Sequence, residues 1–322
     1  MTNITRRAAL AAPLLLSPAA ARAQWGPSRP VTFLVGFAAG GVIDLVARSL
    51  AQSLSGILGQ NVVVENRTGA AGTIATTAML RAPADGHTIA FSAIHMATNP
   101  HLLPVDYETG RDIDMVVQTG SVPVLFLASA ASEIRSVADA VAAMRAGEVP
   151  FASGGVGTSA HLAAELFARR LGVRFTHVPF RGGAPSLQAV MSGNPPLSFT
   201  VAAEGAFGAI RGGRIRGLAV MQDTRIEVMP DMPTIVEAGF GPELFISSWH
   251  GVMMRSGLPP EMRARWFDAI NQAVASEGVR ETMRRSGVEP RTTTDTQAFN
   301  RFVAAELVRW GEVIRAAGIS AS

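Results

Sequence analysis

The sequence predicts an α/β protein built from two similar lobes. Short apolar, β-branched runs alternate with segments of helical periodicity, a pattern typical of βαβ units around a parallel sheet. The order strand, glycine-rich turn, helix occurs twice, beginning at Val31 and again at Val149. Of the 322 residues, 48% are hydrophobic and 16% are charged, which indicates a folded chain.

The first series of elements rests on a clear helical period. Apolar residues between Ile43 and Ile57 recur at spacings of three and four, and Gly59 is placed to end that helix. Glycine-rich or proline-containing turns separate the other elements. The expected series is a strand at 31–35, a helix at 43–57, a strand at 62–64, a helix at 74–80 and a strand at 88–91.

The second series begins near Val122, and the last third of the chain is more helical. Thr294 and Gln297 predict a capping box for the final helix, and the Met, Phe and Trp stripes of this region indicate core packing. The expected elements are strands at 124–128, 149–152, 175–179, 197–201 and 218–221, and helices at 136–146, 158–171 and 261–277.

Charge and cysteine content exclude several classes of function. The 28 basic residues are all arginine, and the chain has 25 acidic residues, which gives a net charge of +3. Three of these arginines lie in residues 1–23, which contain no acid, so the remainder has 25 of each sign. A neutral chain has no bulk attraction for nucleic acid, and none is expected as a partner. The absence of cysteine excludes disulfides, thiolate metal sites and a cysteine nucleophile.

Residues 1–23 predict a cleaved export signal. The pair Arg6-Arg7 precedes an apolar stretch at 8–16, and residues 21–23 form a small-x-small cleavage site. The arginine pair fits a twin-arginine signal as well as an ordinary secretory one, and both routes stay open. The apolar stretch is too short to span a bilayer. The mature chain is expected to begin near Gln24.

Two glycine-rich loops are candidate anion sites. The segment Phe37-Ala-Ala-Gly-Gly41, with Asp44, lies between a strand and a helix, where unpaired N–H groups and the helix dipole attract anions. The alternative is a tight turn in which Asp44 only bonds the first helical turn. The second segment, 153–160, offers N–H groups and the hydroxyls of Ser153, Thr158 and Ser159.

Neither loop predicts a cofactor. Gly155-x-Gly157-x-x-Ala160 matches part of a dinucleotide fingerprint, but no acid ends the following strand, and a P-loop lysine is missing. A serine hydrolase was weighed because Ser153 and Ser159 lie near His161, but no G-x-S-x-G elbow is present. The six histidines have no metal-ligand spacing. We therefore expect no metal, no cofactor and no enzyme.

The paired loops predict one anionic ligand held between two lobes. Each helix start contributes roughly 0.3–2 kcal/mol to a bound anion. Facing helix starts suit either a dicarboxylate or a single carboxylate held from both sides. Closing the lobes excludes water and strengthens each hydrogen bond.

Several motifs occur in a fixed order along the chain. They are Val35-Gly-Phe-Ala-Ala-Gly-Gly41 with Asp44, Gly59-Gln-Asn-Val-Val-Val-Glu-Asn-Arg67, Pro83-Ala-Asp-Gly86, Asn99-Pro100, Ser153-Gly-Gly-Val-Gly-Thr-Ser-Ala-His-Leu162, His177-Val-Pro-Phe-Arg-Gly182, Pro230-Asp-Met-Pro-Thr234 with Glu237, and Trp249-x-Gly251. In these motifs and their order the chain resembles the extracytoplasmic solute-binding proteins of tripartite tricarboxylate transporters, often called Bug proteins. The resemblance spans Pro30 to Ile319.

The resemblance implies a periplasmic, two-lobed Venus-flytrap fold, each lobe a mixed, mostly parallel sheet flanked by helices. Lobe 1 is expected at 24–121 and 225–322, and lobe 2 at 122–224. The implied function is capture of a small carboxylate by a monomer and delivery to the membrane permease subunits, without any reaction. The alternative partner is a sensor kinase, to which a ligand-sensing accessory protein of the same fold presents its bound form.

The resemblance also implies ligand-binding residues, and two positions depart from the family pattern. Ile43 replaces a usual Ser or Thr, and Thr200 stands where relatives often have Asp. Loss of that acid disfavours a ligand with an amino group, so a plain or aromatic acid is expected. The ligand-binding residues expected are Phe37, Ala38, Gly40, Gly41, Asp44, His95, Ser153, Gly157, Thr158 and Thr200.

Overall fold

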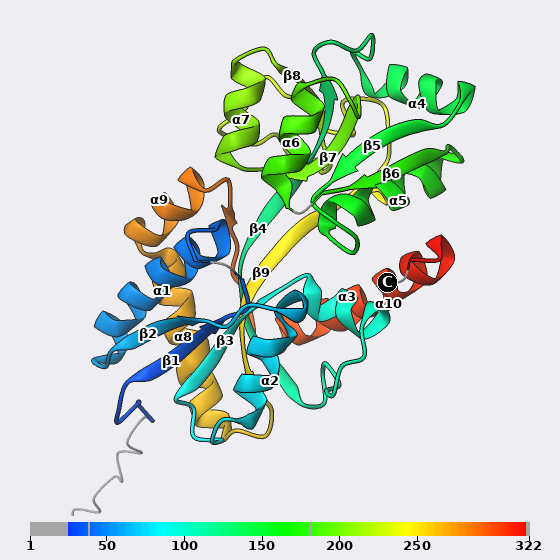
Figure 1. The fold of residues 1–322 in the computed structure, drawn as a ribbon. Coiled ribbons are helices and arrows are strands. Elements are labelled where there is room, and N and C mark those ends of the chain that lie inside the picture. The colour runs from blue at the N-terminus through cyan, green and yellow to red at the C-terminus, as the bar shows by residue number, and fades with distance from the viewer. Residues whose placement is uncertain (1–24, 38, 181, 320–322) are drawn as a thin grey trace, which may run out of the picture.

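The structure, a computed structural model, describes residues 25–37, 39–180 and 182–319. The chain forms two α/β lobes, and the long strands β4 (Ile113–Ser129) and β9 (Ser247–Arg255) run between them (Figure 1). The expected export signal at 1–23 lies outside the described residues. No helix in the described part of the chain is both long and apolar enough to cross a membrane.

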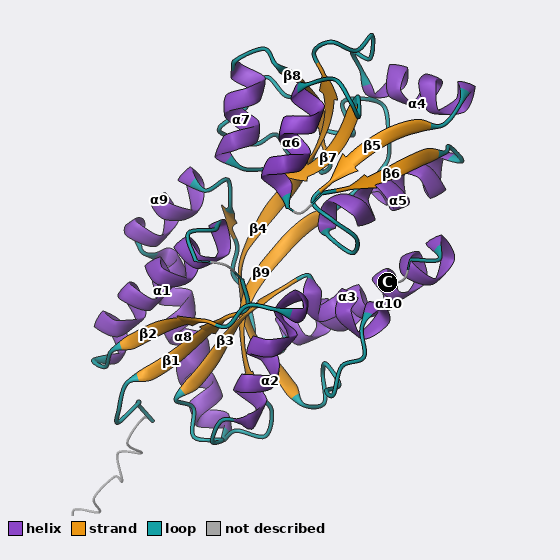
Figure 2. Cartoon of the chain, viewed as in Figure 1, coloured by secondary structure: helices purple, strands orange, loops and turns teal. Residues whose placement is uncertain are grey.

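The first lobe contains a sheet in the order β2-β1-β3-β9-β4, with helices on both of its faces (Figure 2). Strands β1, β2 and β3 pair in parallel, whereas β9 runs antiparallel to β3 and β4. The elements are β1 (Val31–Val35), α1 (Val42–Leu58), β2 (Val62–Asn66), η1 (Ala70–Gly72), α2 (Thr73–Arg81), β3 (Thr88–Ala93), α3 (His95–Leu102), α8 (Pro260–Ala275), α9 (Glu277–Arg285), β10 (Glu289–Pro290) and α10 (Ala298–Ala317).

The second lobe contains a sheet in the order β4-β7-β5-β6, and β8 also pairs with β4. Its parallel pairs are β5 with β6 and β5 with β7, and its antiparallel pairs involve β4. The elements are α4 (Val137–Ala146), β5 (Val149–Ser153), α5 (Ser159–Leu171), β6 (Phe175–Pro179), α6 (Gly183–Met191), β7 (Leu197–Val201), α7 (Glu204–Arg211), β8 (Ile215–Val220) and η2 (Pro242–Leu244).

Strand β4 belongs to both sheets. Its first part, up to Pro123, pairs with β9, and from Val124 onward it pairs with β7 and β8. Pro123 lies at the change of partners and has no N–H to donate, which suits a position where one ladder ends. The sequence pattern predicted only 124–128 of this strand and did not predict β9.

The second lobe extends further along the chain than the sequence indicated. Residues after 224 were expected in lobe 1, but the N–H of Val220 donates to Pro233 O at 2.9 Å and the N–H of Ile235 donates to Val220 O at 2.8 Å. The N–H of Ile246 donates to Met221 O at 3.0 Å. The chain therefore folds back on β8 and returns to the first lobe only with β9.

The predicted core helices are confirmed, with one exception at a helix start. In α1, Val46, Leu50 and Leu54 are fully buried, and Gly59 ends the helix in the left-handed region at φ 68°. The capping box expected at the last helix is wrong. The helix begins at Ala298 with Gln297 as its N-cap, which makes no side-chain cap bond. The N–H of Gln297, which a capping box would donate to Thr294, donates instead to Asp295 Oδ1 at 2.8 Å.

Helix α10 is tied to the crossing strand β9 by a buried carboxylate. Glu306 Oε2 accepts hydrogen bonds from Trp249 Nε1 at 3.1 Å and from Trp310 Nε1 at 2.8 Å. Both indole rings are at most 1% exposed, and Glu306 is 7% exposed. One oxygen therefore satisfies two buried donors from different elements.

Candidate functional site

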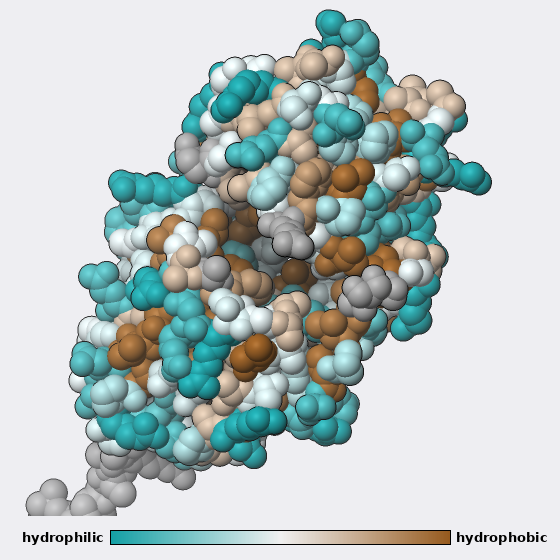
Figure 3. All heavy atoms as spheres, in the orientation of Figure 1, coloured by the Kyte–Doolittle hydropathy of each residue, from teal (hydrophilic) through white to brown (hydrophobic). Residues whose placement is uncertain are grey.

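A cavity of about 380 Å³ lies between the two lobes. Figure 3 shows apolar residues on both sides of the hollow between them. Its lining from the first lobe includes Phe37, Ile43, Ile94, His95, Asn99 and Leu102. Its lining from the second lobe includes Gly154, Val156, Thr158, Ser159, Gly183 and Thr200.

The first-lobe wall is built by α3 and by the loop after β1. Helix α3 begins at His95, directly after β3, so His95, Thr98 and Asn99 lie at the sheet edge that faces the second lobe. Asn99 Nδ2 donates to Ala71 O at 3.0 Å, which fixes the loop before α2 against α3. The second bond of this amide, to Thr73 Oγ1 at 3.3 Å, ties α3 to the start of α2 as well.

His95 contributes a neutral polar group to this wall. The residue is 6% exposed, and its ring meets the edge of Phe37 at a centroid distance of 5.3 Å. Burial lowers the pKa of His95 to about 4, so the imidazole is uncharged at neutral pH. Its Nδ1 has no hydrogen-bond partner among the described residues. The structure places His95, one of the expected ligand-binding residues, in the wall of the cavity.

The second-lobe wall contains the starts of α5 and α6. Thr158 caps α5 by accepting from the N–H of His161 at 3.3 Å, and its hydroxyl donates to Gly155 O at 2.8 Å. The N–H of Gly182 donates to Gly154 O at 3.1 Å, which joins the two loops. Two helix starts, with their unpaired N–H groups, therefore meet at this side of the cavity.

The contact between these two loops requires a glycine at position 154. A Cβ on Gly154 would lie 3.2 Å from the carbonyl carbon of Gly182 and 3.2 Å from the nitrogen of Gly183. Both neighbours are backbone atoms and cannot rotate away. The glycine thus permits the close approach that aligns the starts of α5 and α6.

Ser153 supports the second loop from behind. Its hydroxyl lies 2.7 Å from His177 Nε2 and accepts from the N–H of Gly155 at 3.1 Å. The rings of His161 and His177 stack at 3.9 Å, and burial, followed by the nearby His161, lowers the pKa of His177 to about 4. Ser153 is fully buried, and these bonds show that its hydroxyl holds the loop.

Asp44 likewise holds the first loop together. Its carboxylate accepts from the N–H of Gly40 at 2.8 Å, from Arg48 Nε at 2.9 Å and from Asn66 Nδ2 at 2.8 Å. Burial raises the pKa of Asp44, but these hydrogen bonds outweigh burial and the pKa lies below its usual range. Of the two alternatives for Asp44, this geometry favours the one in which it fixes the turn.

The residues expected to bind ligand divide into two groups. Ser153 and three first-loop residues support the loops without lining the cavity, and Ala38 lies outside the described residues. Ligand contact by any of them stays a prediction. The cavity-lining members are Phe37, His95, Gly157, Thr158 and Thr200, and the supporting members are Gly40, Gly41, Asp44 and Ser153.

Sequence reasoning missed two parts of the wall. Thr98, Asn99 and Leu102 come from α3, which has a proline in its second turn and no clear apolar period. The Asn99-Pro100 pair was noted as a motif and was the available signal. Ser248 lines the cavity from β9, and its only signal was the neighbouring Trp249-x-Gly251 motif.

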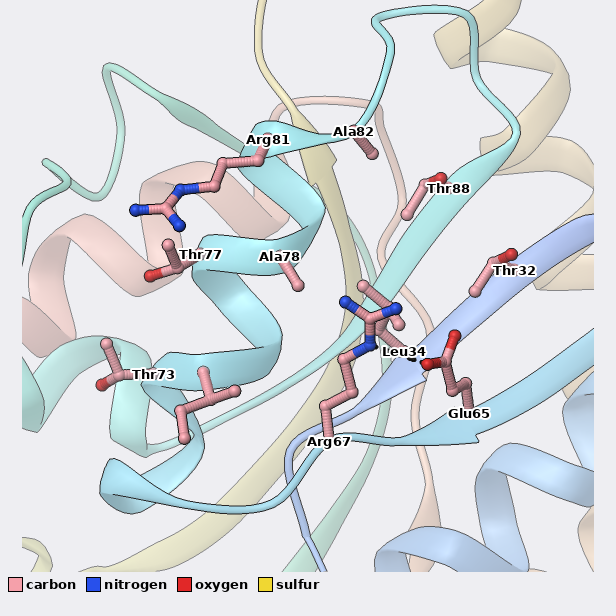
Figure 4. A pocket seen from close by; sticks show the side chains of 11 residues that line it. Thr32, Leu34, Glu65, Arg67, Thr73, Thr77, Ala78, Arg81, Ala82 and Thr88 are labelled. Carbon is pink, nitrogen blue, oxygen red and sulfur yellow. Dashed lines mark hydrogen bonds and ion pairs between the residues drawn. The ribbon is translucent and has the colours of Figure 1, made fainter.

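A second cavity, of about 650 Å³, lies on the first lobe alone (Figure 4). It is an open groove between α2 and the strands β1 and β2. Arg67 lines it, but its guanidinium is paired with Glu65 at 2.7 Å. The glycine-rich loops do not contribute to it, so we place the ligand site between the lobes. Among the described residues, no group of three or more His, Asp or Glu side chains is arranged to hold a metal ion.

Two α/β lobes around a cavity, with crossing strands between them, are the architecture of the periplasmic-binding-protein fold. The family model for the tripartite tricarboxylate transporter family receptor matches residues 46–319, and the chain belongs to this family of solute-binding proteins. The fold class predicted from the sequence is thereby confirmed, as is the resemblance.

Individual relatives agree with this assignment. Protein BugT of Bordetella pertussis is 34% identical over 302 residues, which cover 91% of this chain and 90% of BugT. The structure of the periplasmic binding protein BugD has a TM-score of 0.76 at 29% identity, covering 92% of this chain and 100% of BugD.

Two similar structures hold carboxylates. Rpa4515 of R. palustris, solved with adipate, has a TM-score of 0.77 at 31% identity and covers 92% of this chain and 99% of its own. MatC of Rhodopseudomonas palustris, solved with bound malate, has a TM-score of 0.74 at 29% identity and covers 89% of this chain and 99% of its own.

Proposed function

We propose that this protein is a periplasmic receptor that captures a small carboxylate between its lobes and delivers it to the permease of a tripartite tricarboxylate transporter. Export through the signal predicted at 1–23 brings it to the periplasm. The ligand stays chemically unchanged, and no cofactor takes part.

The observation that carries the proposal is the convergence of the α5 and α6 starts on one cavity. Ser159 is the first residue of α5 and lines the cavity, and Gly183 is the first residue of α6. Helix starts bind anions through unpaired N–H groups and the helix dipole. Family membership and the carboxylates held by two similar proteins support the same ligand chemistry.

Calorimetry with a charge reversal at the helix start tests carboxylate capture. The protein from Gln24 onward is unfolded and refolded to remove bound ligand, then titrated with malate, adipate, hexanoate, 3-phenylpropanoate, citrate and glutamate. We expect one of these to bind stoichiometrically at micromolar concentration. Ser159→Asp should abolish that binding, because a carboxylate at the helix start occupies its N–H groups and repels an anionic ligand.

Ser159→Asn is the matched control, since it has nearly the same size as the aspartate and no charge. It should retain binding within about tenfold. Equal binding by Ser159→Asp and the wild type would show that the ligand is not an anion held at α5. Silence of the wild type toward every acid would contradict carboxylate capture.

Delivery to a permease needs a separate measurement. Uptake of the radiolabelled ligand is compared in cells that have the permease and either carry or lack this protein. Uptake should require the protein and should fail with Ser159→Asp. Uptake that is independent of the protein would contradict the receptor role and would favour the sensing alternative.

A further inference from the structure

We infer that the cavity selects a monocarboxylate with an apolar body, and that it discriminates against a second carboxylate and against an ammonium group. This inference rests on the proposed function and concerns the part of the ligand that the helix starts do not hold.

The described part of the cavity wall carries no charged side chain. None of the described residues that line the cavity is an Asp, Glu, Lys or Arg. The one titratable side chain among them, His95, is buried and uncharged at neutral pH. A ligand body in this cavity therefore has no described side chain with which to form an ion pair.

Two acidic groups lie near the wall without lining it. The Asp44 carboxylate accepts hydrogen bonds from Arg48, Asn66 and the N–H of Gly40, as described above. Glu165 lies in α5, where its carboxylate is 3.4 Å from His161 Nε2. Both residues have neighbours within their own lobe, and neither is among the residues that line the cavity.

Much of the cavity wall is aliphatic. Ile43, Ile94 and Leu102 from the first lobe and Val156 and Val201 from the second present aliphatic side chains to the ligand. Burying such surface against an apolar ligand is favourable, at about 25 cal/mol for each Å² removed from water. A carboxylate or ammonium against the same surface would lose its hydration without a partner.

The polar groups that remain are neutral. Thr200 and Ser248 offer hydroxyls, and His95 offers an imidazole whose Nδ1 is buried and has no hydrogen-bond partner among the described residues. Such groups can bond a hydroxyl, carbonyl or ether on the ligand body. None of them can form an ion pair with a second charge on the ligand, so specificity follows from charge as well as from shape.

Two matched ligand series test the inference by calorimetry on the refolded protein. The linear series is hexanoate, adipate and 2-aminohexanoate, which differ by a second carboxylate or an α-ammonium. The aromatic series is 3-phenylpropanoate, its 4-carboxy derivative and phenylalanine. In at least one series the monoacid should bind, and there it should bind at least about 100-fold more tightly than the other two members.

A charge substitution at Thr200 provides the second arm, with the monoacid that binds more tightly as the probe. Thr200→Asp should weaken this monoacid at least about tenfold more than Thr200→Asn does, because the two variants match in size and differ in charge. Thr200→Asp should also narrow the gap between the monoacid and the corresponding amino acid.

Several results would overturn the inference while leaving carboxylate capture intact. The first such result is a diacid or amino acid that binds as tightly as the matched monoacid. The second is the absence of measurable binding in both series together with tight binding of malate or citrate. Equal effects of Thr200→Asp and Thr200→Asn would also contradict it. Silence toward every carboxylate would instead contradict the proposed function.

Discussion

Lowering the pH from 7 to 5 should destabilise this protein through its buried histidines. His95 and His250 are 6% and 2% exposed, and burial lowers the pKa of each from 6.5 to about 4. At pH 5 both histidines are protonated in the unfolded chain, whereas both are mostly unprotonated in the folded chain. Stability is therefore full above pH 6.5 and is lost as the pH falls from about 6.5 toward 4.

The magnitude follows from the two pKa values. For a site that titrates near 6.5 when unfolded and near 4 when folded, linkage gives about 2 kcal/mol of lost stability at pH 5. Two such sites give about 4 kcal/mol, against a typical total of about 5–15 kcal/mol. Half-buried His177 adds a smaller part in the same direction. Acids with a lowered pKa, such as Asp112 at about 2, titrate below this window.

Urea unfolding followed by circular dichroism at pH 7 and at pH 5 measures the effect. His250→Leu is the informative variant, because His250 packs against Phe91 at a centroid distance of 5.5 Å and its Nδ1 has no hydrogen-bond partner in the described part of the chain. It should remove about 2 kcal/mol of the pH dependence. A wild-type loss below about 1 kcal/mol, or an unchanged pH dependence in His250→Leu, would refute the reasoning.

Two further predictions concern packing at the site and at β9. Gly154→Ala should cost about 1–3 kcal/mol and weaken ligand binding about tenfold or more, measured by urea unfolding and calorimetry, because its Cβ would push apart the loops that start α5 and α6. Gly278→Ala, where a Cβ meets nothing within 4 Å, is the control; it should leave ligand binding intact and should not lower stability, because Ala favours the helix α9 over Gly. Glu306→Ala should cost about 2–6 kcal/mol in urea unfolding, because it leaves the buried indoles of Trp249 and Trp310 without an acceptor. Glu306→Gln retains one oxygen and should cost clearly less; equal losses in both variants would contradict this account.

Local signals predicted the parts of the fold that depend on neighbours in sequence. The helix from Ile43 to Ile57 was predicted because its apolar period and Gly59 are local features, and α1 has these limits within a residue. Strand β9 and the first half of β4 were missed because their stability comes from pairing across more than a hundred residues, as with Met115 and Met253. Such pairing produces no periodic pattern in the sequence of either segment.

The site was predicted only in part for a related reason. The glycine-rich loops were recognised because glycines between a strand and a helix imply a turn and a helix start. Whether Asp44 faces a ligand or its own loop depends on Asn66, 22 residues away, and the sequence did not indicate that contact. Ser248 reaches the cavity only because β9 pairs with β3 and β4.

The position of Ser248 gives the cavity a mechanical property. Ser248 pairs with Val122, one residue before β4 changes partners at Pro123, so the cavity wall includes a strand that joins the two lobes. A ligand that contacts Ser248 would lie beside the strands that connect the lobes. In a rotation of one lobe about these strands, displacements increase with distance from them. A small rotation beside Ser248 would thus produce larger displacements at the outer rims of the lobes, where the proposed permease would meet a different surface in the loaded and in the empty protein.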